Sequence, residues 1–255
     1  MANTVYENKV IEARAKDLLT TAVNTRSLMA VDNSLVAEAG MTKTIHTYTY
    51  TGEVEELGVG EGNTTTGSIT YSPVDYTVKM NQQRFSYYDE DFMKDNTIVD
   101  NSLKGANQKM VNKMTADFIG ECEKATVVHS GAMSYDTIVD AIAKLNVENE
   151  ADLFVLINPA QKAELRKDPD YVAARMGEVV YNGQVGTIAG LPVIVSKAAT
   201  NAYVMSKDAV KLFMKKDVEV KQERKENERE NIVYLRTAYV VALADATKIC
   251  KITEA

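Results

Sequence analysis

Apolar and polar residues alternate in two stretches of the first third of the chain, which is the pattern of half-buried β-strands. One stretch runs from Thr44 to Tyr50 and the other from Ser68 to Ser86. The sequence between them, residues 52–67, is rich in glycine and glutamate. Two strands joined by so long and flexible a tip have too little core beneath them to be stable alone. We therefore expect this hairpin to find its partner surface on another subunit.

A helical spacing of three or four residues governs the next stretch, which reaches Lys124. Its apolar stripe consists of Val99, Leu103, Ala106, Met110, Met114 and Phe118. This spacing places the stripe on one face of a single long helix. Asn96 or Thr97 is expected to cap the helix, and the acidic residues 89–91 suit the approach to its N-terminus. A helix of this length is unusual in a compact domain.

Shorter elements follow in the second half of the chain. A second helix is expected over Ser134–Leu145, with Ser134 as its N-cap. The apolar run Leu153–Ile157 predicts a buried strand, and Asn158 followed by Pro159 then starts another helix with proline at its first position. Gly190–Val195 predicts a glycine turn that leads into a β-branched strand.

Further strands are expected near the C-terminus, at 202–205, 210–214, 218–221, 232–243 and 246–252. Late strands after early helices indicate an α+β protein and not an alternating βαβ series. At the other end, residues 10–23 have the pattern of an amphipathic helix, and residues 27–43 have little periodicity. Residues 27–43 are either an ordinary loop after a first helix or an arm that embraces neighbouring subunits.

Composition narrows the class of protein. The chain has 255 residues, of which 45% are hydrophobic and 25% charged, so it can bury a sizeable core. A net charge of −7 argues against a general nucleic-acid binder, which needs a basic surface. There is no apolar stretch near the length of a membrane span and no signal-peptide pattern, so we expect a soluble intracellular product with no membrane partner.

The sequence contains few residues that could form a catalytic, phosphate-binding or metal-binding site. Gly58, Gly60 and Gly62 are misplaced for a dinucleotide-binding loop, and the glutamates around them would repel phosphate, so a mobile acidic loop is the better interpretation. His46 and His129 have no neighbouring ligand pattern. The two cysteines, Cys122 and Cys250, form no C-x-x-C motif and are interpreted as reduced structural thiols, although a spatial Cys–His pair stays open. We expect no catalytic, cofactor-binding or metal-binding residues and no cofactor.

One charged run stands out between two expected strands. Residues 215–230 contain six basic and six acidic side chains, so the run has no net charge. A DNA-binding arm would carry mostly basic residues and a positive net charge. The run is either a solvated hairpin tip or a self-complementary surface between subunits, where charge sets geometry and partner choice more than stability.

Three of these segments together resemble a known family. Leu153–Lys167, Gly190–Val195 and the late strands 232–243 and 246–252 follow one another as in the A-domain of tailed-phage major capsid proteins with the HK97 fold. The resemblance implies an N-terminal arm, an extended E-loop hairpin, a P-domain with a long spine helix, and a mixed α/β A-domain. The implied division is 1–44 for the arm, 45–86 for the E-loop hairpin, 87–130 for the P-domain with the spine helix, 131–213 for the A-domain, and 214–255 for the returning strands of both domains.

The same resemblance implies a function. Major capsid proteins assemble as hexamers and pentamers of an icosahedral head around double-stranded DNA, so the expected partners are other copies of the chain, portal, scaffolding and decoration proteins, and DNA in non-specific contact. The expected location is the virion, after assembly in the host cytoplasm. Because the sequence starts directly at the arm, scaffolding is expected to be separate or dispensable. An encapsulin-type compartment is the alternative with the same fold, and a soluble α+β enzyme is the rival from another class.

Overall fold

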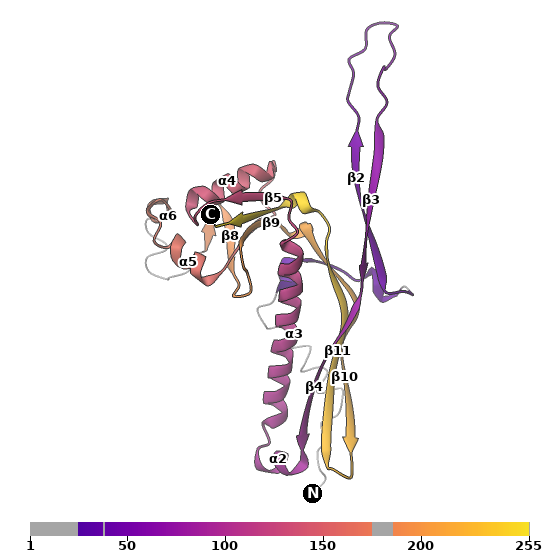
Figure 1. Cartoon of the computed structure of the whole chain (residues 1–255), viewed down its shortest axis with the longest axis vertical. Helices are drawn as coiled ribbons and strands as arrows, with labels where there is room; N and C mark the ends of the chain where they lie inside the picture. The colour runs from indigo at the N-terminus through magenta and orange to yellow at the C-terminus, as the bar shows by residue number, and fades with distance from the viewer. Residues whose placement is uncertain (1–24, 38, 175–185, 255) are drawn as a thin grey trace.

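The computed structural model describes residues 25–37, 39–174 and 186–254. Figure 1 shows a long body, in which one helix runs beside a sheet of long strands, with a second block of short strands and helices at its side. A two-stranded hairpin projects beyond one end of the body. The expected first helix at residues 10–23 lies outside the described residues.

The long sheet has the strand order β1-β10-β11-β4, in which β1 is parallel to β10 and the other pairs are antiparallel. Its strands are β1 (Ala30–Asp32), β10 (Val210–Lys225), β11 (Glu230–Leu243) and β4 (Lys79–Tyr88). Two short 3-10 turns, η1 (Thr25–Leu28) and η2 (Ser34–Val36), flank β1. Because Met29 and Leu35 are buried, this part of the expected arm packs on its own chain.

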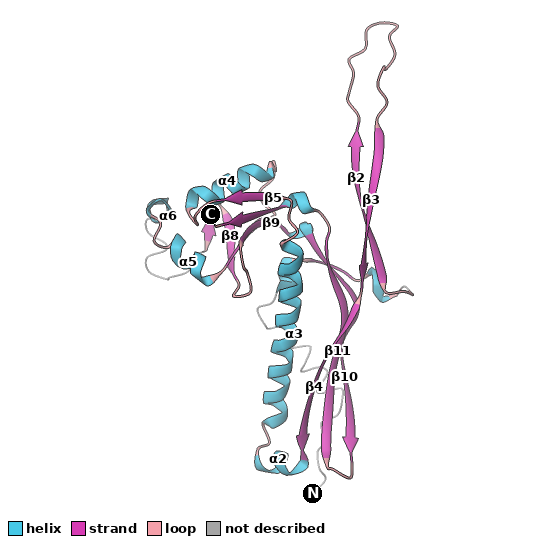
Figure 2. Ribbon diagram, viewed as in Figure 1, coloured by secondary structure: helices cyan, strands magenta, loops and turns pink. Residues whose placement is uncertain are grey.

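The long helix α3 (Ile98–Cys122) covers one face of this sheet (Figure 2). All six residues of the predicted apolar stripe are buried, so the sequence interpretation of this helix is confirmed. Thr97 occupies the N-cap position, but its side chain makes no capping hydrogen bond. The acidic residues 89–91 do not approach α3 directly, because they form the first turn of a separate short helix, α2 (Asp89–Lys94).

The second sheet is mixed and has the order β5-β12-β9-β6-β8-β7. Its strands are β5 (Val127–Ser130), β12 (Ile249–Thr253), β9 (Ala202–Ser206), β6 (Leu153–Ile157), β8 (Leu191–Val195) and β7 (Thr187–Ile188). Helices α4 (Tyr135–Leu145), α5 (Pro159–Leu165) and α6 (Pro169–Ala174) accompany it, together with the 3-10 turns η3 (Lys207–Ala209) and η4 (Ala246–Lys248). One core lies between this sheet and α4, and another connects the sheet to α3.

Local sequence signals account for the boundaries in this block. The Ser134 side chain accepts a hydrogen bond from the Thr137 amide and caps α4, as predicted. Asn158 caps α5 in a capping box with Gln161, and the proline that follows is the first residue of the helix. The two-residue turn between β7 and β8 has positive φ angles at both positions, 49° and 81°, and the second is Gly190. That is the turn type whose twist suits a tight hairpin.

The third sheet is the isolated ribbon of β2 (Thr42–Thr51) and β3 (Ser68–Thr77). The single strand expected over residues 68–86 is therefore wrong: the chain leaves the ribbon at Val78, and β4 pairs with β11 in the long sheet. Val78 is buried beside Leu35 and Phe213, which anchors the switch between the two sheets. The mixture of helices and two kinds of sheet confirms the α+β class.

Candidate functional site

The β2–β3 ribbon has two chemically different faces. Register pairs Tyr48 with Tyr71 and Tyr50 with Ile69, and because side chains alternate, these four residues lie on one face. Their exposed fractions are 70% and 62% for the first pair, and 60% and 52% for the second. The two rings of the first pair lie 6.5 Å apart, centroid to centroid. A contiguous face of large apolar side chains at this exposure marks an interaction surface.

The opposite face is polar along the outer part of the ribbon. It carries only threonine and serine there: Thr47, Thr49, Thr51, Ser68, Thr70 and Ser72. Thr51 Oγ1 lies 2.9 Å from Ser68 Oγ, and Thr47 Oγ1 donates to the Ser72 carbonyl oxygen at 3.0 Å. The hydroxyls of Thr47 and Thr51 therefore have partners within the ribbon itself. The ribbon is thus amphipathic, with one face suited to solvent and the other to a partner.

The tip of the ribbon, residues 52–67, is braced by one carboxylate. Glu55 accepts hydrogen bonds from the backbone amides of Thr64 and Thr65, at 2.7 and 2.8 Å, and from both threonine hydroxyls. The hydroxyl of Thr65 and the amide of Thr64 contribute most, and together these bonds lower the pKa of Glu55 to about 2. The expected mobile acidic loop therefore contains a specific cross-connection between its two strands.

Only residues 226–229 of the charged run at 215–230 form an exposed hairpin turn. β10 continues to Lys225 and β11 starts at Glu230, so most of the run is strand, and Val218 and Val220 within it are buried. Alternating valines among charged residues are what a strand with one buried face requires.

Many charges of the run are paired within the chain. Arg224 contacts Asp89 of α2 at 2.9 Å, and Arg229 contacts Glu90 at 2.7 Å. Lys225 contacts Glu230 at 2.9 Å. The two arginine pairs join the β10–β11 turn to α2 at the far end of the body, and the lysine pair closes the hairpin itself. The run therefore serves intrachain structure at these positions, and neither sequence interpretation describes it fully.

Glu123, which sequence reasoning missed, joins the long helix to the mixed sheet. It stands at the C-cap of α3 and its Oε1 accepts hydrogen bonds from Thr200 Oγ1 at 2.5 Å, Asn201 Nδ2 at 2.8 Å and Tyr203 Oη at 2.5 Å. Lys251 Nζ lies 3.3 Å from its Oε2. Partial burial opposes the charge, but these partners outweigh it and lower the pKa of Glu123 to about 2.

The residues considered for chemistry are not brought together. Gly58 and Gly60 lie in the tip with no helix after them, and His46 is exposed on β2. Cys122 and Cys250 are free and buried, and burial raises the pKa of each thiol, so neither is an activated nucleophile. In the part of the chain that the structure describes, no group of three or more His, Cys, Asp or Glu could hold a metal ion, and no helix is long and apolar enough to cross a membrane.

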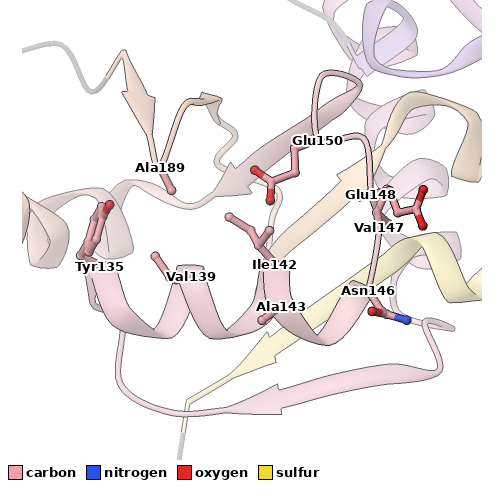
Figure 3. A pocket seen from close by; sticks show the side chains of 9 residues that line it. All are labelled: Tyr135, Val139, Ile142, Ala143, Asn146, Val147, Glu148, Glu150 and Ala189. Atoms are coloured by element: carbon pink, nitrogen blue, oxygen red, sulfur yellow. The ribbon is translucent and has the colours of Figure 1, made fainter.

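The described residues of the body form grooves in two places. The first, about 590 Å³, lies between α4, the loop after it and the β7–β8 turn. Figure 3 shows its apolar floor, which includes Val139 and Ile142, and two carboxylates at one end, Glu148 and Glu150. The lining includes no histidine, cysteine or serine, so it offers no nucleophile with a base beside it.

The second groove lies between α3 and β4. It consists of two adjoining hollows of about 300 and 240 Å³ that share Asn81, Lys113 and Tyr239. The smaller hollow contains Lys109 and Lys113 but no acidic residue, whereas the larger contains Lys79 together with Asp117 and Glu121. Its lysines and amides suit an anionic or polar partner and form no catalytic arrangement.

Comparison with known proteins places this geometry in a family. A family model described as phage capsid protein matches residues 70–252. A major capsid protein of Staphylococcus phage phiMR11 is 25% identical over 240 residues, which cover 89% of this chain and 86% of that protein.

Solved structures agree with the sequence match. A structure from Mycobacterium phage Che8 superposes with a TM-score of 0.72 and 14% identity, covering 91% of this chain and 92% of that chain. The capsid of cyanophage P-SCSP1u gives a TM-score of 0.71 at 11% identity, covering 89% and 86% of the two chains. At such identities these likenesses establish the fold, and the expected HK97-like fold is confirmed.

Proposed function

This chain belongs to the phage capsid protein family, and from that premise we propose that its copies join as hexamers and pentamers of an icosahedral head that encloses double-stranded DNA. It is a structural capsid protein of a phage virion and not an enzyme, and it assembles into a multimeric shell. Nothing in the described residues favours the encapsulin alternative.

The apolar face of the β2–β3 ribbon carries this proposal. Four large side chains on it are more than half exposed although they belong to a strand pair with no core of its own. Fully burying one such side chain contributes about 1.5–3 kcal/mol, so this face gains most of its stability only when a second surface covers it. We propose that the surface belongs to a neighbouring subunit of the shell.

Other parts of the proposal rest on the family resemblance. We propose the division into arm (1–44), E-loop hairpin (45–86), P-domain (87–130), A-domain (131–213) and returning strands (214–255). Within the hairpin segment, the ribbon itself consists of the paired strands 42–51 and 68–77, and β4, from Lys79 onward, pairs in the long sheet. Function then resides in surfaces and not in a catalytic, cofactor or metal site. Portal, scaffolding and decoration proteins are proposed partners, and assembly takes place in the host cytoplasm. Contact with packaged DNA is proposed to be non-specific, and the net charge of −7 argues against strong electrostatic attachment to it.

Removing the ribbon tip tests the proposal. Deletion of Glu55–Thr65 should leave a folded subunit, because the tip contributes nothing to the described core clusters, while particle formation should fail. Circular dichroism reports folding, and light scattering with electron microscopy reports particles. A stable wild-type monomer at all concentrations and salt conditions would refute the shell function, and an unfolded deletion variant would refute the role of the tip.

A matched pair of variants tests the face itself. Tyr48→Ser with Tyr71→Ser removes the aromatic pair, whereas Thr49→Ala with Thr70→Ala changes a directly opposed pair on the polar face. We expect only the tyrosine variant to assemble poorly, with both subunits folded. Equal assembly of the two variants would show that the apolar face does not contact another subunit.

A further inference from the structure

Helix α4 carries two apolar stripes, although a surface helix needs only one to join its own core. The first stripe includes Ile138 and Leu145, which are buried between α4 and the mixed sheet. The second stripe consists of Tyr135, Val139 and Ile142, also at helical spacing. These three residues line the groove of about 590 Å³ between α4, the loop after it and the β7–β8 turn, here named the α4 groove.

Part of the floor of the α4 groove is open to solvent. Val139 is 39% exposed, and Val147 in the loop after α4 is 38% exposed, whereas Tyr135 and Ile142 are partly buried. Figure 3 shows that the side chains of Tyr135, Val139 and Ile142 point to the same side of α4. The helix has eleven residues and is about 16 Å long, so a groove along it accommodates about three turns of a second helix.

Negative charge surrounds this floor. Residues 135–152 contain five carboxylates and one lysine, a net charge of −4, which is more than half of the −7 of the whole chain. All five carboxylates are exposed, and none forms an ion pair with a described residue. They belong to Asp136, Asp140, Glu148, Glu150 and Asp152. The rim of the groove is therefore strongly acidic and unneutralised by the described residues.

The position of two of these carboxylates adds to the negative potential. Glu148 and Glu150 line the groove just beyond the C-terminal end of α4, where the last carbonyls of the helix carry partial negative charge. Lys144, in the last turn, does not line the groove, and its Nζ donates to the Val128 carbonyl oxygen at 3.1 Å. A cationic partner would relieve this repulsion, so the charges favour lysine or arginine in whatever covers the floor.

The chain has no cationic helix of its own to place in this groove. None of the five described α-helices, α2 to α6, carries a net positive charge. The amphipathic pattern at residues 10–23 contains two basic and two acidic residues and is neutral. A second copy of the chain therefore offers the groove only a neutral or an acidic helix, and charge complementarity favours a different protein.

We propose that the α4 groove binds a basic amphipathic helix of a separate protein. Its apolar residues would lie against Val139 and Val147, and its lysine or arginine residues would face Glu148 and Glu150. An amphipathic helix that lies in an apolar groove is a recurrent mode of recognition, and here it covers the floor and neutralises the rim together. The inference rests on the proposed function, because it gives one partner protein of the shell its attachment site and its chemistry.

Isothermal titration calorimetry of the unassembled full-length subunit tests the proposal. The probe is a synthetic helical peptide with leucine at every third or fourth position and lysine elsewhere, and its control has glutamate in place of lysine. The lysine peptide should bind at about 0.1 M salt and lose affinity toward 1 M, because salt screens the charges; the glutamate peptide should not bind. Absence of binding by the lysine peptide would overturn the inference, whereas the shell function is judged separately, from particles of the wild-type protein.

Matched charge reversals locate the binding site. Glu148→Lys with Glu150→Lys should weaken binding of the lysine peptide by about tenfold or more, because like charges then meet. Glu164→Lys with Asp208→Lys changes the net charge by the same amount at exposed positions outside the groove lining. This control should change the affinity by less than about threefold, since salt screens charges outside the contact. Equal weakening by the two double variants would overturn the assignment to the groove.

The apolar floor and the competing occupant are tested with the same probe. Val139→Ser with Val147→Ser should also weaken peptide binding by about tenfold, because the floor loses apolar area. Both valines are exposed, so the melting curve of the subunit should not change. The pure protein with Glu148→Lys and Glu150→Lys should still form particles as the wild type does. Loss of particles in this variant alone, with the Glu164 and Asp208 control assembling normally, would assign the groove to a second copy and overturn the proposal.

Discussion

Replacing Glu123 should weaken the contact between the long helix and the mixed sheet. Its carboxylate is the acceptor for four side chains that come from the loop before β9, from β9 and from β12: Thr200, Asn201, Tyr203 and Lys251. Of these donors, the Tyr203 side chain is fully buried, so its hydroxyl has little access to water if the acceptor is removed.

The size of the effect follows from these contacts. A hydrogen bond to a charged group contributes about 1.5–3 kcal/mol, and a buried donor left without a partner costs about 1–3 kcal/mol. The Glu123 side chain is 36% exposed, so water and salt weaken the ionic part. We therefore expect Glu123→Ala to lower the free energy of unfolding by about 2–3 kcal/mol, which corresponds to a fall in Tm of about 5–10 °C for a chain of this size.

Comparison with Glu123→Gln isolates the charge. Glutamine keeps an oxygen in the place of Oε1, so it should lose about half as much stability as alanine. The pKa of Glu123 is lowered in the folded state from 4.5 to about 2, so its contribution is present above pH 4.5 and is lost as the pH falls toward 2. The Tm difference between wild type and Glu123→Gln should shrink across the same interval.

The assay is thermal unfolding of the unassembled subunit, followed by circular dichroism from pH 7 to pH 3. Glu164→Gln on the exposed side of α5 is the matched control and should leave the Tm unchanged at every pH. A Glu123→Ala protein that melts within about 1 °C of wild type at pH 7 would show that the four contacts of this carboxylate do not stabilise the subunit, because their loss should lower the Tm by several degrees.

Two further predictions concern the cores of the subunit. Phe118→Ala in α3 should lower the free energy of unfolding by about 3–5 kcal/mol in urea titration, because the ring is fully buried and alanine leaves a cavity; a loss below 1 kcal/mol would contradict this packing. The Oδ1 atom of Asn158 caps α5 by accepting a hydrogen bond from the Gln161 amide at 2.8 Å, so Asn158→Ala should lower the free energy of unfolding by about 1 kcal/mol. Asn158→Ser keeps a capping oxygen and should therefore retain most of this stability. Equal losses in the two variants would exclude the cap as the cause.

Sequence predicted those parts of the fold that depend on neighbours in the chain. The stripe from Val99 to Phe118 and the cap at Ser134 were read correctly, because helix periodicity and capping are set within a few residues. The Asn158–Pro159 boundary is of the same kind. The strand Leu153–Ile157 was recognisable because burial on both faces requires an unbroken apolar run.

Local sequence patterns did not predict which distant segments pair as strands. A strand-like pattern covers Ser68–Ser86, and no glycine, proline, asparagine or aspartate stands at residues 77–79, where the chain changes its partner from β2 to β11. Within the charged run at 215–230 the sequence predicted the strand at 218–221, but it did not reveal that β10 continues to Lys225 or that Arg224 and Arg229 pair with residues of α2. Glu123 gave no signal, since its four partners lie about 77 to 128 positions away in sequence.

The candidate site was visible only in part, and the reason is physical. The long glycine-rich connection indicated that the ribbon needs another subunit, but which face is apolar depends on register, and register is fixed across two strands and not within one. Once Tyr48 is opposed to Tyr71, the polar residues necessarily share the other face. The body of the subunit is stable through its own buried clusters, whereas the ribbon is a strand pair too thin to be stable alone. We therefore expect ordering of the ribbon to be coupled to assembly, so that the energy of subunit contact is concentrated in the element that contributes least to the fold of a single chain.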